Sequence, residues 1–194
     1  MNKVEFKIMN ESLRDFDDNG MPQYATEGSA AFDLRAMFKG ESTKKQTVDS
    51  DGKLVIQPNE SVLVPTGIAI NINNVEIGAL VLPRSSVGAK RGLLARLWEF
   101  DCEELNDDLD VGNICGLIDS DYQGEIFVSV WNRSDDVQTI EFGERIAQLL
   151  FTPVVKPNLY EAFTLVEHVE MEHTEEFSTT TERGEGGLGS TGKK

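Results

Sequence analysis

The sequence predicts an all-β fold, an antiparallel β-barrel or jelly roll with very little helix and a flexible glycine-rich C-terminal arm. Three observations predict it. Short runs rich in β-branched and aromatic residues recur along most of the chain. Gly, Pro, Asn or Asp bound most of these runs, as they do where tight turns join strands. Helical periodicity is almost absent, which favours strands packed as a barrel or as two layers.

The first strand is expected at the N-terminus, where Val4, Phe6 and Ile8 alternate with charged side chains. Further strands are expected at residues 61–65, 78–83, 126–131 and 146–151, and turns at residues 58–60 and 65–67. One or two helical turns within residues 85–91 are the only helix that the sequence predicts.

The chain is expected to form one β-barrel domain, residues 1–178, followed by an arm, residues 179–194. The arm is rich in glycine and has too little apolar surface to fold until a ligand orders it. Two polar stretches, about 38–53 and 94–110, are expected to be insertions. The second is acidic around three apolar side chains, which favours a solvated loop or short helix. A docking surface for a protein partner is the alternative.

Charge and cysteine usage narrow the class of protein. The 194 residues carry 34 acidic against 18 basic side chains, a net charge of −16. Such a chain repels polyanions, so it is not expected to bind nucleic acid, although a small phosphorylated substrate remains possible where arginines and a cation gather. Two cysteines without Cys-x-x-Cys spacing, no signal-like N-terminus and no membrane-length apolar run predict a soluble cytoplasmic protein without membrane contact.

Residues 112–124 carry the sharpest functional signal. Glycines punctuate this stretch as they do where a hairpin joins a strand, and a short apolar pair delivers Asp119 to the strand end. Tyr122 follows three residues later. A carboxylate and an aromatic ring beside a tight turn suit a small-molecule pocket, in which the carboxylate can orient or deprotonate a water.

Three other segments suit a bound phosphate. Residues 83–88 place an arginine and two serines at a turn, and residues 143–148 enter a strand with Gln148 as an amide donor. Residues 187–194 nearly match a P-loop, but Lys194 occupies the position of the magnesium-binding hydroxyl, so a P-loop is rejected. The free amides of a glycine-rich chain can still wrap phosphates.

Taken in order, five segments resemble the five motifs of the trimeric dUTPase family: residues 29–36, 83–88, 112–124, 143–148 and 183–192. The resemblance runs from about Tyr24 to Gly192, interrupted by the two insertions. It implies an enzyme that hydrolyses dUTP to dUMP and pyrophosphate by water attack on the α-phosphorus. Such an enzyme keeps uracil out of DNA and supplies dUMP for dTMP synthesis.

The resemblance also implies roles for individual residues. Asp119 would orient and deprotonate the attacking water, and Tyr122 would pack against the deoxyribose. Asp33 would act through another side chain or a water. The implied ligands of the base and the phosphates are Arg84, Ser85, Ser86, Asn113, Gly116, Leu117, Ile118, Gln148, Arg183, Leu188, Gly189 and Ser190.

Mg²⁺ and a homotrimer follow from the resemblance alone. In the family, the ion is held mainly by substrate phosphates and water, so no protein metal ligands are expected. Three chains contribute motifs to each site, so dUTP would bind between copies of the chain.

Two positions depart from the family pattern, and two other functions stay open. Ala31 stands where the first motif usually has Gly, and Leu188 stands where Phe usually stacks on uracil. Losing that stacking costs on the order of 1 kcal/mol, so weaker ground-state binding is expected. The alternatives are a dCTP deaminase or bifunctional enzyme of the same fold, and a regulatory binding protein that acts through residues 94–110.

Overall fold

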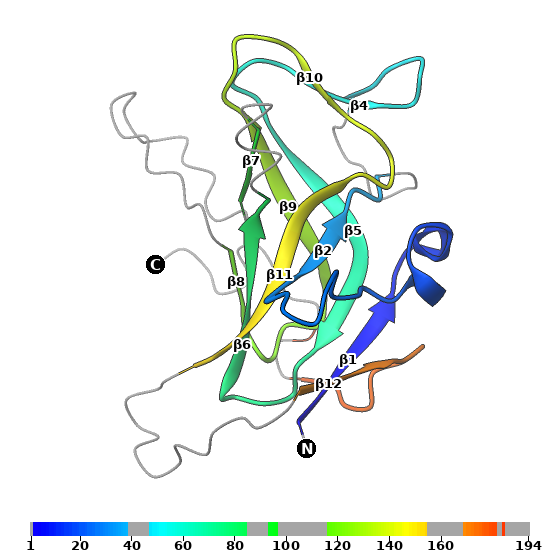
Figure 1. Ribbon diagram of the computed structural model, residues 1–194, viewed down its shortest axis with the longest axis vertical. Coiled ribbons are helices and arrows are strands. Elements are labelled where there is room, and N and C mark those ends of the chain that lie inside the picture. The colour runs from blue at the N-terminus through cyan, green and yellow to red at the C-terminus, as the bar shows by residue number, and fades with distance from the viewer. Residues whose placement is uncertain are drawn as a thin grey trace.

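The computed structural model describes residues 2–38, 47–84, 93–96, 116–154, 169–181 and 184, and the regular secondary structure in these ranges is almost entirely β-strand (Figure 1). The strands are β1 (Asn2–Ile8), β2 (Phe32–Arg35), β3 (Thr47–Val48), β4 (Leu54–Ile56), β5 (Ser61–Asn71), β6 (Ile77–Pro83), β7 (Leu93–Arg96), β8 (Gly116–Ile118), β9 (Glu125–Asn132), β10 (Gln138–Ile140), β11 (Arg145–Pro153) and β12 (Val169–His173). Two short 3₁₀ turns, η1 (Glu11–Asp15) and η2 (Asp18–Gly20), are the only helical elements in these ranges. The predicted all-β class is therefore confirmed.

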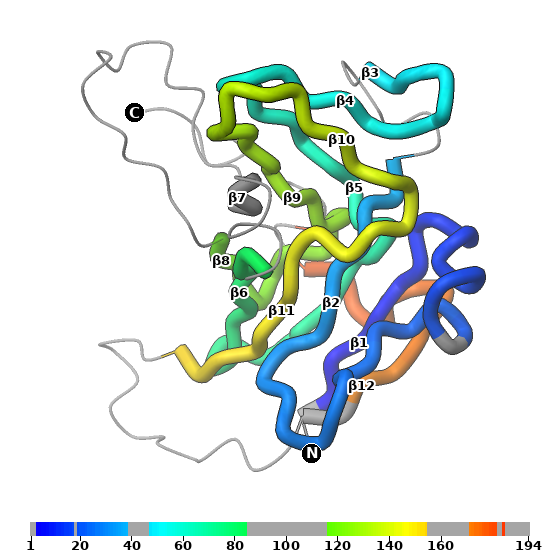
Figure 2. Tube along the Cα trace, turned by 45° about the horizontal axis from the view of Figure 1, so that its top comes forward, coloured from blue at the N-terminus to red at the C-terminus, as the bar shows by residue number. Residues whose placement is uncertain are grey.

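The strands form three sheets. The largest has the order β12-β1-β5-β9-β7, the second β2-β11-β6-β8, and a small third sheet β10-β4-β3. Neighbouring strands are antiparallel except for β12, which pairs with β1 in parallel and lies beside it in Figure 2. None of the helical elements in the described ranges is long and apolar enough to cross a membrane.

One hydrophobic core joins the two larger sheets. Inward side chains of β2, β6 and β11 belong to the same buried cluster as those of β1, β5 and β9. Its aromatic centre is formed by Phe6 and Phe32, whose ring centroids lie 5.6 Å apart, with Phe151 packed against both. Strict alternation in β2, where Phe32 and Leu34 are buried and their neighbours are not, fixes which face of that strand points outward.

Local structure near the predicted insertions and helix differs in detail from the sequence expectations. Phe38 is a core residue, and β3 pairs with β4 across a turn in which Asp49 accepts two backbone hydrogen bonds. Residues 94–96 belong to edge strand β7, which pairs with β9. The predicted helical turns at 85–91 and the remaining residues of the acidic insertion, 97–110, lie outside the described residues.

The 3₁₀ turn at η1 was not predicted. The Asn10 side chain caps this turn by accepting a hydrogen bond from the Ser12 N–H at 3.0 Å.

The predicted turn at residues 65–67 is wrong, because β5 continues through it. The β5–β9 register shifts between Pro65 and Ala69, which marks a bulge. Gly67 occupies this bulge with a φ of +71°, a conformation that other residues rarely adopt. Its N–H donates to the Glu125 Oε1 at 2.8 Å, so a side chain of β9 replaces the missing ladder bond.

The Glu125 carboxylate is held in an unfavourable environment. Burial raises the pKa of Glu125, and the hydrogen bond from the Gly67 N–H opposes this only in part. Because the folded state favours the protonated acid, this group's stabilising contribution is present below the ordinary pKa of 4.5 and is lost as the pH rises through the raised value.

Glu125→Gln is therefore expected to be at least as stable as the wild type at pH 7.5, because the amide keeps an acceptor for Gly67 and removes the buried charge. This advantage should disappear at pH 4. Glu125→Ala, which leaves the Gly67 N–H without its acceptor, should lose about 1–3 kcal/mol. Urea denaturation at both pH values measures these differences. The assignment would be contradicted if the stability of Glu125→Gln, measured as its difference from wild type, were lower at pH 7.5 than at pH 4.

Candidate active site

Residues from three of the predicted motifs meet on the sheet β2-β11-β6-β8. Gln148 of β11 lies directly opposite Asp33 of β2 on one side and Leu82 of β6 on the other. Arg84 follows β6 immediately. Residues directly opposite one another in a sheet share a face, so Asp33 and Gln148 point outward together, away from the core.

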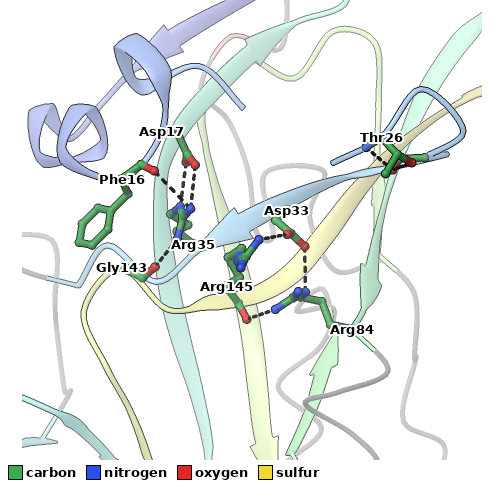
Figure 3. Close-up of polar contacts among 9 residues, drawn as sticks. Phe16, Asp17, Thr26, Asp33, Arg35, Arg84, Gly143 and Arg145 are labelled. Atoms are coloured by element: carbon green, nitrogen blue, oxygen red, sulfur yellow. Dashed lines mark hydrogen bonds and ion pairs between the residues drawn. The ribbon is translucent and has the colours of Figure 1, made fainter. Parts of the chain in front are cut away.

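An ion-pair cluster orders this end of the sheet (Figure 3). The Asp33 Oδ1 lies 2.8 Å from the Arg84 Nε, and the Asp33 Oδ2 lies 3.2 Å from the Arg145 Nη1. Arg84 also donates from Nη1 to the Arg145 carbonyl at 3.0 Å. A single carboxylate thus sits between two guanidinium groups, so the cluster keeps a net positive charge in a chain whose total charge is −16.

The geometry gives Asp33 a definite structural task. A guanidinium carries five N–H donors on a long side chain, and its direction is set by what holds it. Asp33 and the Arg145 carbonyl hold two edges of Arg84, while its side chain stays partly exposed. A head group fixed in this way is ready to bind an anion without first losing conformational entropy.

Gln148 is also held by its neighbours. Its Nε2 donates to the Pro83 carbonyl at 3.0 Å, which ties the fourth motif to the residue just before Arg84. The amide that the sequence predicts as a phosphate donor thus makes a hydrogen bond across the sheet.

The third motif forms strand β8 and the turn that follows it. Along β8, Gly116 and Ile118 are buried while Leu117 is 57% exposed and points outward. Asp119 comes directly after the strand, is exposed, and begins a turn in which its carbonyl accepts the Tyr122 N–H at 3.2 Å. The structure confirms the expected delivery of this carboxylate to a strand end.

Tyr122 is fixed by a close backbone approach. Its hydroxyl donates to the Glu125 carbonyl at 2.7 Å, so the ring lies over Gly124. A Cβ at Gly124 would come within 2.6 Å of the Tyr122 hydroxyl, which explains why glycine stands at this position.

The two halves of the site lie far apart within one chain. Ile118 pairs with Ala79 and Gly116 with Val81, so β8 runs antiparallel to β6, and Asp119 lies at the opposite end of this pairing from Arg84. Asp119 is level with Gly78 of β6, six positions before Arg84, which is about 20 Å along the strand. A single chain therefore does not bring its carboxylate to its own arginine cluster.

The remaining predicted site residues lie outside the described residues: Ser85, Ser86, Asn113, Arg183, Leu188, Gly189 and Ser190. Within the described ranges, no group of three or more His, Cys, Asp or Glu side chains is arranged to hold a metal ion.

Sequence reasoning missed two residues near the site. Arg145 lies three residues before Gln148. In a regular strand, this odd spacing would place the side chains of Arg145 and Gln148 on opposite faces, yet Arg145 contacts Asp33, which lies opposite Gln148. A register shift between Arg145 and Ala147 breaks that alternation, so periodicity alone does not place Arg145. Gln123 is buried at 5% exposure in the turn after Tyr122, and only its position inside the third motif could have drawn attention to it.

Comparison with known proteins places this arrangement in a family. The model of the family described as dUTPase matches residues 17–103 and 105–192. The chain belongs to the dUTPase family. A deoxyuridine 5'-triphosphate nucleotidohydrolase of Sodalis glossinidius is 41% identical over 194 residues and covers 100% of both chains. Another protein of that name, from Hydrogenovibrio crunogenus, is 39% identical over 190 residues, 98% of this chain and 97% of its own.

Solved dUTPases share the fold. A Staphylococcus bacteriophage 80alpha dUTPase mutant with dUpNHpp superposes with a TM-score of 0.57 at 22% identity, covering 99% of both chains. A dUTPase mutant from phage phi11 of S. aureus, described with a structural Mg(II) ion, also gives a TM-score of 0.57, at 18% identity over 92% of this chain and 100% of its own. The jelly-roll-like architecture expected from the sequence is thereby confirmed for this dUTPase.

Gly124→Ala is expected to destabilise this dUTPase by about 1–3 kcal/mol, because the new methyl group displaces the Tyr122 ring and breaks its hydrogen bond to the Glu125 carbonyl. Gly28→Ala is the matched control, since a Cβ there meets no atom within 4 Å. Urea denaturation of both variants measures the difference. Equal stabilities for the two alanine variants would contradict the packing described for Tyr122.

Proposed function

We propose that this chain is a dUTP diphosphatase, which hydrolyses dUTP to dUMP and pyrophosphate by water attack on the α-phosphorus. The observation that carries the proposal is the match of the dUTPase family model across all five motifs. The arrangement of Asp33, Arg84 and Gln148 on one outward sheet face supports it, since this face offers an ordered cation to a phosphate.

Asp119 is the residue proposed to orient the attacking water and to take its proton. Its exposed position at the start of a tight turn leaves the carboxylate accessible to a water and a substrate. Placing a water in line with the α-phosphorus removes much of the barrier by itself, so this role depends on geometry more than on an altered acidity.

Arg84 is the phosphate ligand that the described residues support best. Asp33 is proposed to position Arg84 rather than to touch the substrate, because both of its oxygens face guanidinium groups. Ser85, Ser86 and Gln148 would complete the phosphate site. Charge that develops on the leaving pyrophosphate would be stabilised by Arg84 and Gln148, which are already held by their neighbours and need no reorganisation during the reaction.

Tyr122 is proposed to set selectivity for deoxyribose, because its ring is held by the Glu125 carbonyl and by Gly124 and cannot easily yield to a ribose hydroxyl. Asn113 and the backbone of Gly116, Leu117 and Ile118 would read the uracil edge. A site built to pair one set of donors and acceptors rejects a base that leaves them unpaired.

The C-terminal arm is proposed to close over the substrate. Arg183 and Ser190 would reach the triphosphate, and Leu188 and Gly189 would cover the base. Excluding water there strengthens every charge interaction inside the site.

Mg²⁺ is proposed as the cofactor. The donor set fits an ion held through the substrate, since Asp33 is engaged by two arginines and the nearby side chains are cationic. A magnesium ion keeps several waters and binds readily to phosphate oxygens, and it would withdraw charge from the triphosphate. Arg84 would then share the neutralisation of the substrate with the ion.

The active site is proposed to form between copies of the chain, in a homotrimer. The antiparallel β6–β8 register supports this, because it separates Asp119 from Arg84 by about 20 Å along the strand while both must act near one α-phosphorus. Copies of the chain can satisfy both demands if one supplies Asp119 and another supplies Arg84. Light scattering should then give the mass of three chains for the active species, and a fully active monomer would contradict the proposal.

Pyrophosphate release tests the activity directly. With Mg²⁺ present, the wild type is expected to act on dUTP and not on dCTP, dTTP or UTP. Asp119→Asn should lower kcat by about 10²–10⁴-fold, because the amide cannot accept a proton from water. Asp135→Asn, an exposed carboxylate in the β9–β10 turn, is the matched control and should keep wild-type activity.

Two results, from that assay and from a parallel assay of ammonia release, would overturn the proposal. Ammonia release from dCTP would identify a deaminase of the same fold. No release from any of the four nucleotides would leave the acidic residues 94–110 and a binding role as the better explanation. The cytoplasmic location stays a prediction.

A further inference from the structure

Arg35, the last residue of β2, joins two segments that are distant from each other in sequence (Figure 3). Its Nε and Nη2 donate to the two carboxylate oxygens of Asp17, each at 2.8 Å, in a bidentate ion pair. Its Nη1 donates to the Gly143 carbonyl at 2.9 Å. Only 16% of the Arg35 side chain and 23% of the Asp17 side chain are exposed. A forked pair shielded in this way fixes the direction of the guanidinium as well as its distance.

Phe16 packs against the same network. The Arg35 guanidinium carbon lies 5.4 Å from the centroid of the Phe16 ring, and Nη2 also donates to the Phe16 carbonyl at 3.4 Å. The ring lies against Gly143 so closely that no Cβ would fit there. Arg35 and Phe16 therefore hold the turn before β11 from one side.

The backbone of β2 holds this turn as well. The Gly143 N–H donates to the Ala36 carbonyl, and the Ala36 N–H donates to the Glu144 carbonyl, each at 2.8 Å. These contacts matter because the β11–β2 register shifts between Arg145 and Ala147. The regular ladder is interrupted directly after Arg145, so the turn at residues 143–144 sets the position of Arg145.

Arg145 in turn supports Arg84. The Arg145 carbonyl accepts a hydrogen bond from the Arg84 Nη1 at 3.0 Å, and the Arg145 side chain shares the Asp33 carboxylate with Arg84. A continuous series of contacts thus leads from Arg35, through the turn and Arg145, to the guanidinium of Arg84.

The charge of Arg35 also has to be neutralised locally. Arg35 lies directly opposite Arg145 in the sheet and on the same outward face of β2 as Asp33. Like charges at opposing positions repel one another, and an unpaired Arg35 would compete for Asp33. Its forked pair with Asp17 removes both effects and leaves Asp33 to Arg84 and Arg145.

We propose that Arg35 is a positioning residue for the phosphate site: held by Asp17, it fixes the turn at residues 143–144 and thereby the Arg145 carbonyl that orients Arg84. This inference rests on the proposed function, in which Arg84 binds the phosphates of dUTP. It gives a role to a second outward residue of β2, beside Asp33, and to Asp17, a carboxylate that precedes the first motif.

Arg35→Met tests the inference, because methionine keeps part of the arginine side chain and removes all of its hydrogen bonds. An Arg84 that is no longer held must be ordered when a phosphate binds, so kcat/KM for dUTP should fall about two- to tenfold. Arg14→Met is the matched control. Arg14 likewise bridges a carboxylate and a backbone carbonyl, those of Glu11 and Asn19, and its loss should leave kcat/KM unchanged.

A second variant covers a failure to fold. Arg35→Met leaves the Asp17 carboxylate without its cation, which can unfold a protein when the site is shielded from water. Asp17→Leu/Arg35→Met removes both charges together and carries the same expectation for kcat/KM.

A double-mutant cycle separates positioning from a general structural role. Arg84→Lys keeps a positive charge but lacks the Nε–H and Nη1–H groups that Asp33 and the Arg145 carbonyl hold. Arg35→Met should therefore lower kcat/KM less than about twofold further in the Arg84→Lys background. Equal losses in both backgrounds, or no loss in the wild-type background, would overturn the inference.

Nitrogen-15 NMR of the arginine side chains gives a readout that does not depend on activity. In the wild type, the Arg84 Nε–H, identified by its absence in Arg84→Lys, should exchange slowly with water, because the Asp33 Oδ1 lies 2.8 Å away. Arg35→Met should speed this exchange about tenfold or more, and Arg14→Met should not.

The exchange measurement also distinguishes the two proposals. An Arg84 Nε–H that exchanges equally fast in the wild type and in Arg35→Met would overturn the positioning role, whatever the activity. Faster exchange in Arg35→Met, in a protein whose wild type releases no pyrophosphate from dUTP, would refute the proposed function and leave the positioning of Arg84 by Arg35 standing.

Discussion

The antiparallel pairing of β8 with β6 is the constraint on which the proposed mechanism depends. It carries Asp119 out at one end of the second sheet while β6 delivers Arg84 at the other. The burial pattern of β8 fixes that register, because a slip by one residue would expose Ile118 and bury Leu117. Hydrophobic packing of a three-residue strand therefore helps to keep the proposed catalytic carboxylate and the proposed phosphate site of one chain apart.

In the proposed mechanism, the arginine cluster solves a second physical problem, the attraction of a triphosphate to an acidic protein. Long-range repulsion from a net charge of −16 is screened within about 10 Å at ordinary salt, so a local excess of positive charge governs the last approach. Asp33 holds two guanidinium groups together at the sheet edge and still leaves them one positive charge in excess. The Asp33 carboxylate thus allows two positively charged guanidinium groups to pack closely, and it also sets their orientation.

Sequence reasoning predicted the strands and the motifs, and failed where backbone geometry departs from regular alternation. Hydrophobic periodicity placed the cores of β1, β6, β9 and β11 well. It ended β5 too early, since Pro65, Thr66 and Gly67 read as a turn, whereas Glu125 from another strand supports a bulge there. The bulge at Arg145 hid that residue for the same reason. The hydrogen bonds of Gln123 with Thr179 and Thr181 join residues more than fifty positions apart, which no local pattern reports.

Subunit complementation tests the shared site most directly. Asp119→Asn and Arg84→Ala chains, each inactive by itself, would be co-expressed with different affinity tags, and the mixed assemblies would be isolated through both tags. If each site of the proposed trimer takes these two residues from different chains, the isolated mixed assemblies recover about one third of wild-type dUTP turnover per site, because one of the three sites in each mixed trimer then contains both intact residues. Mixed assemblies as inactive as either parent would contradict the account, since they would show that both residues of each site come from one chain.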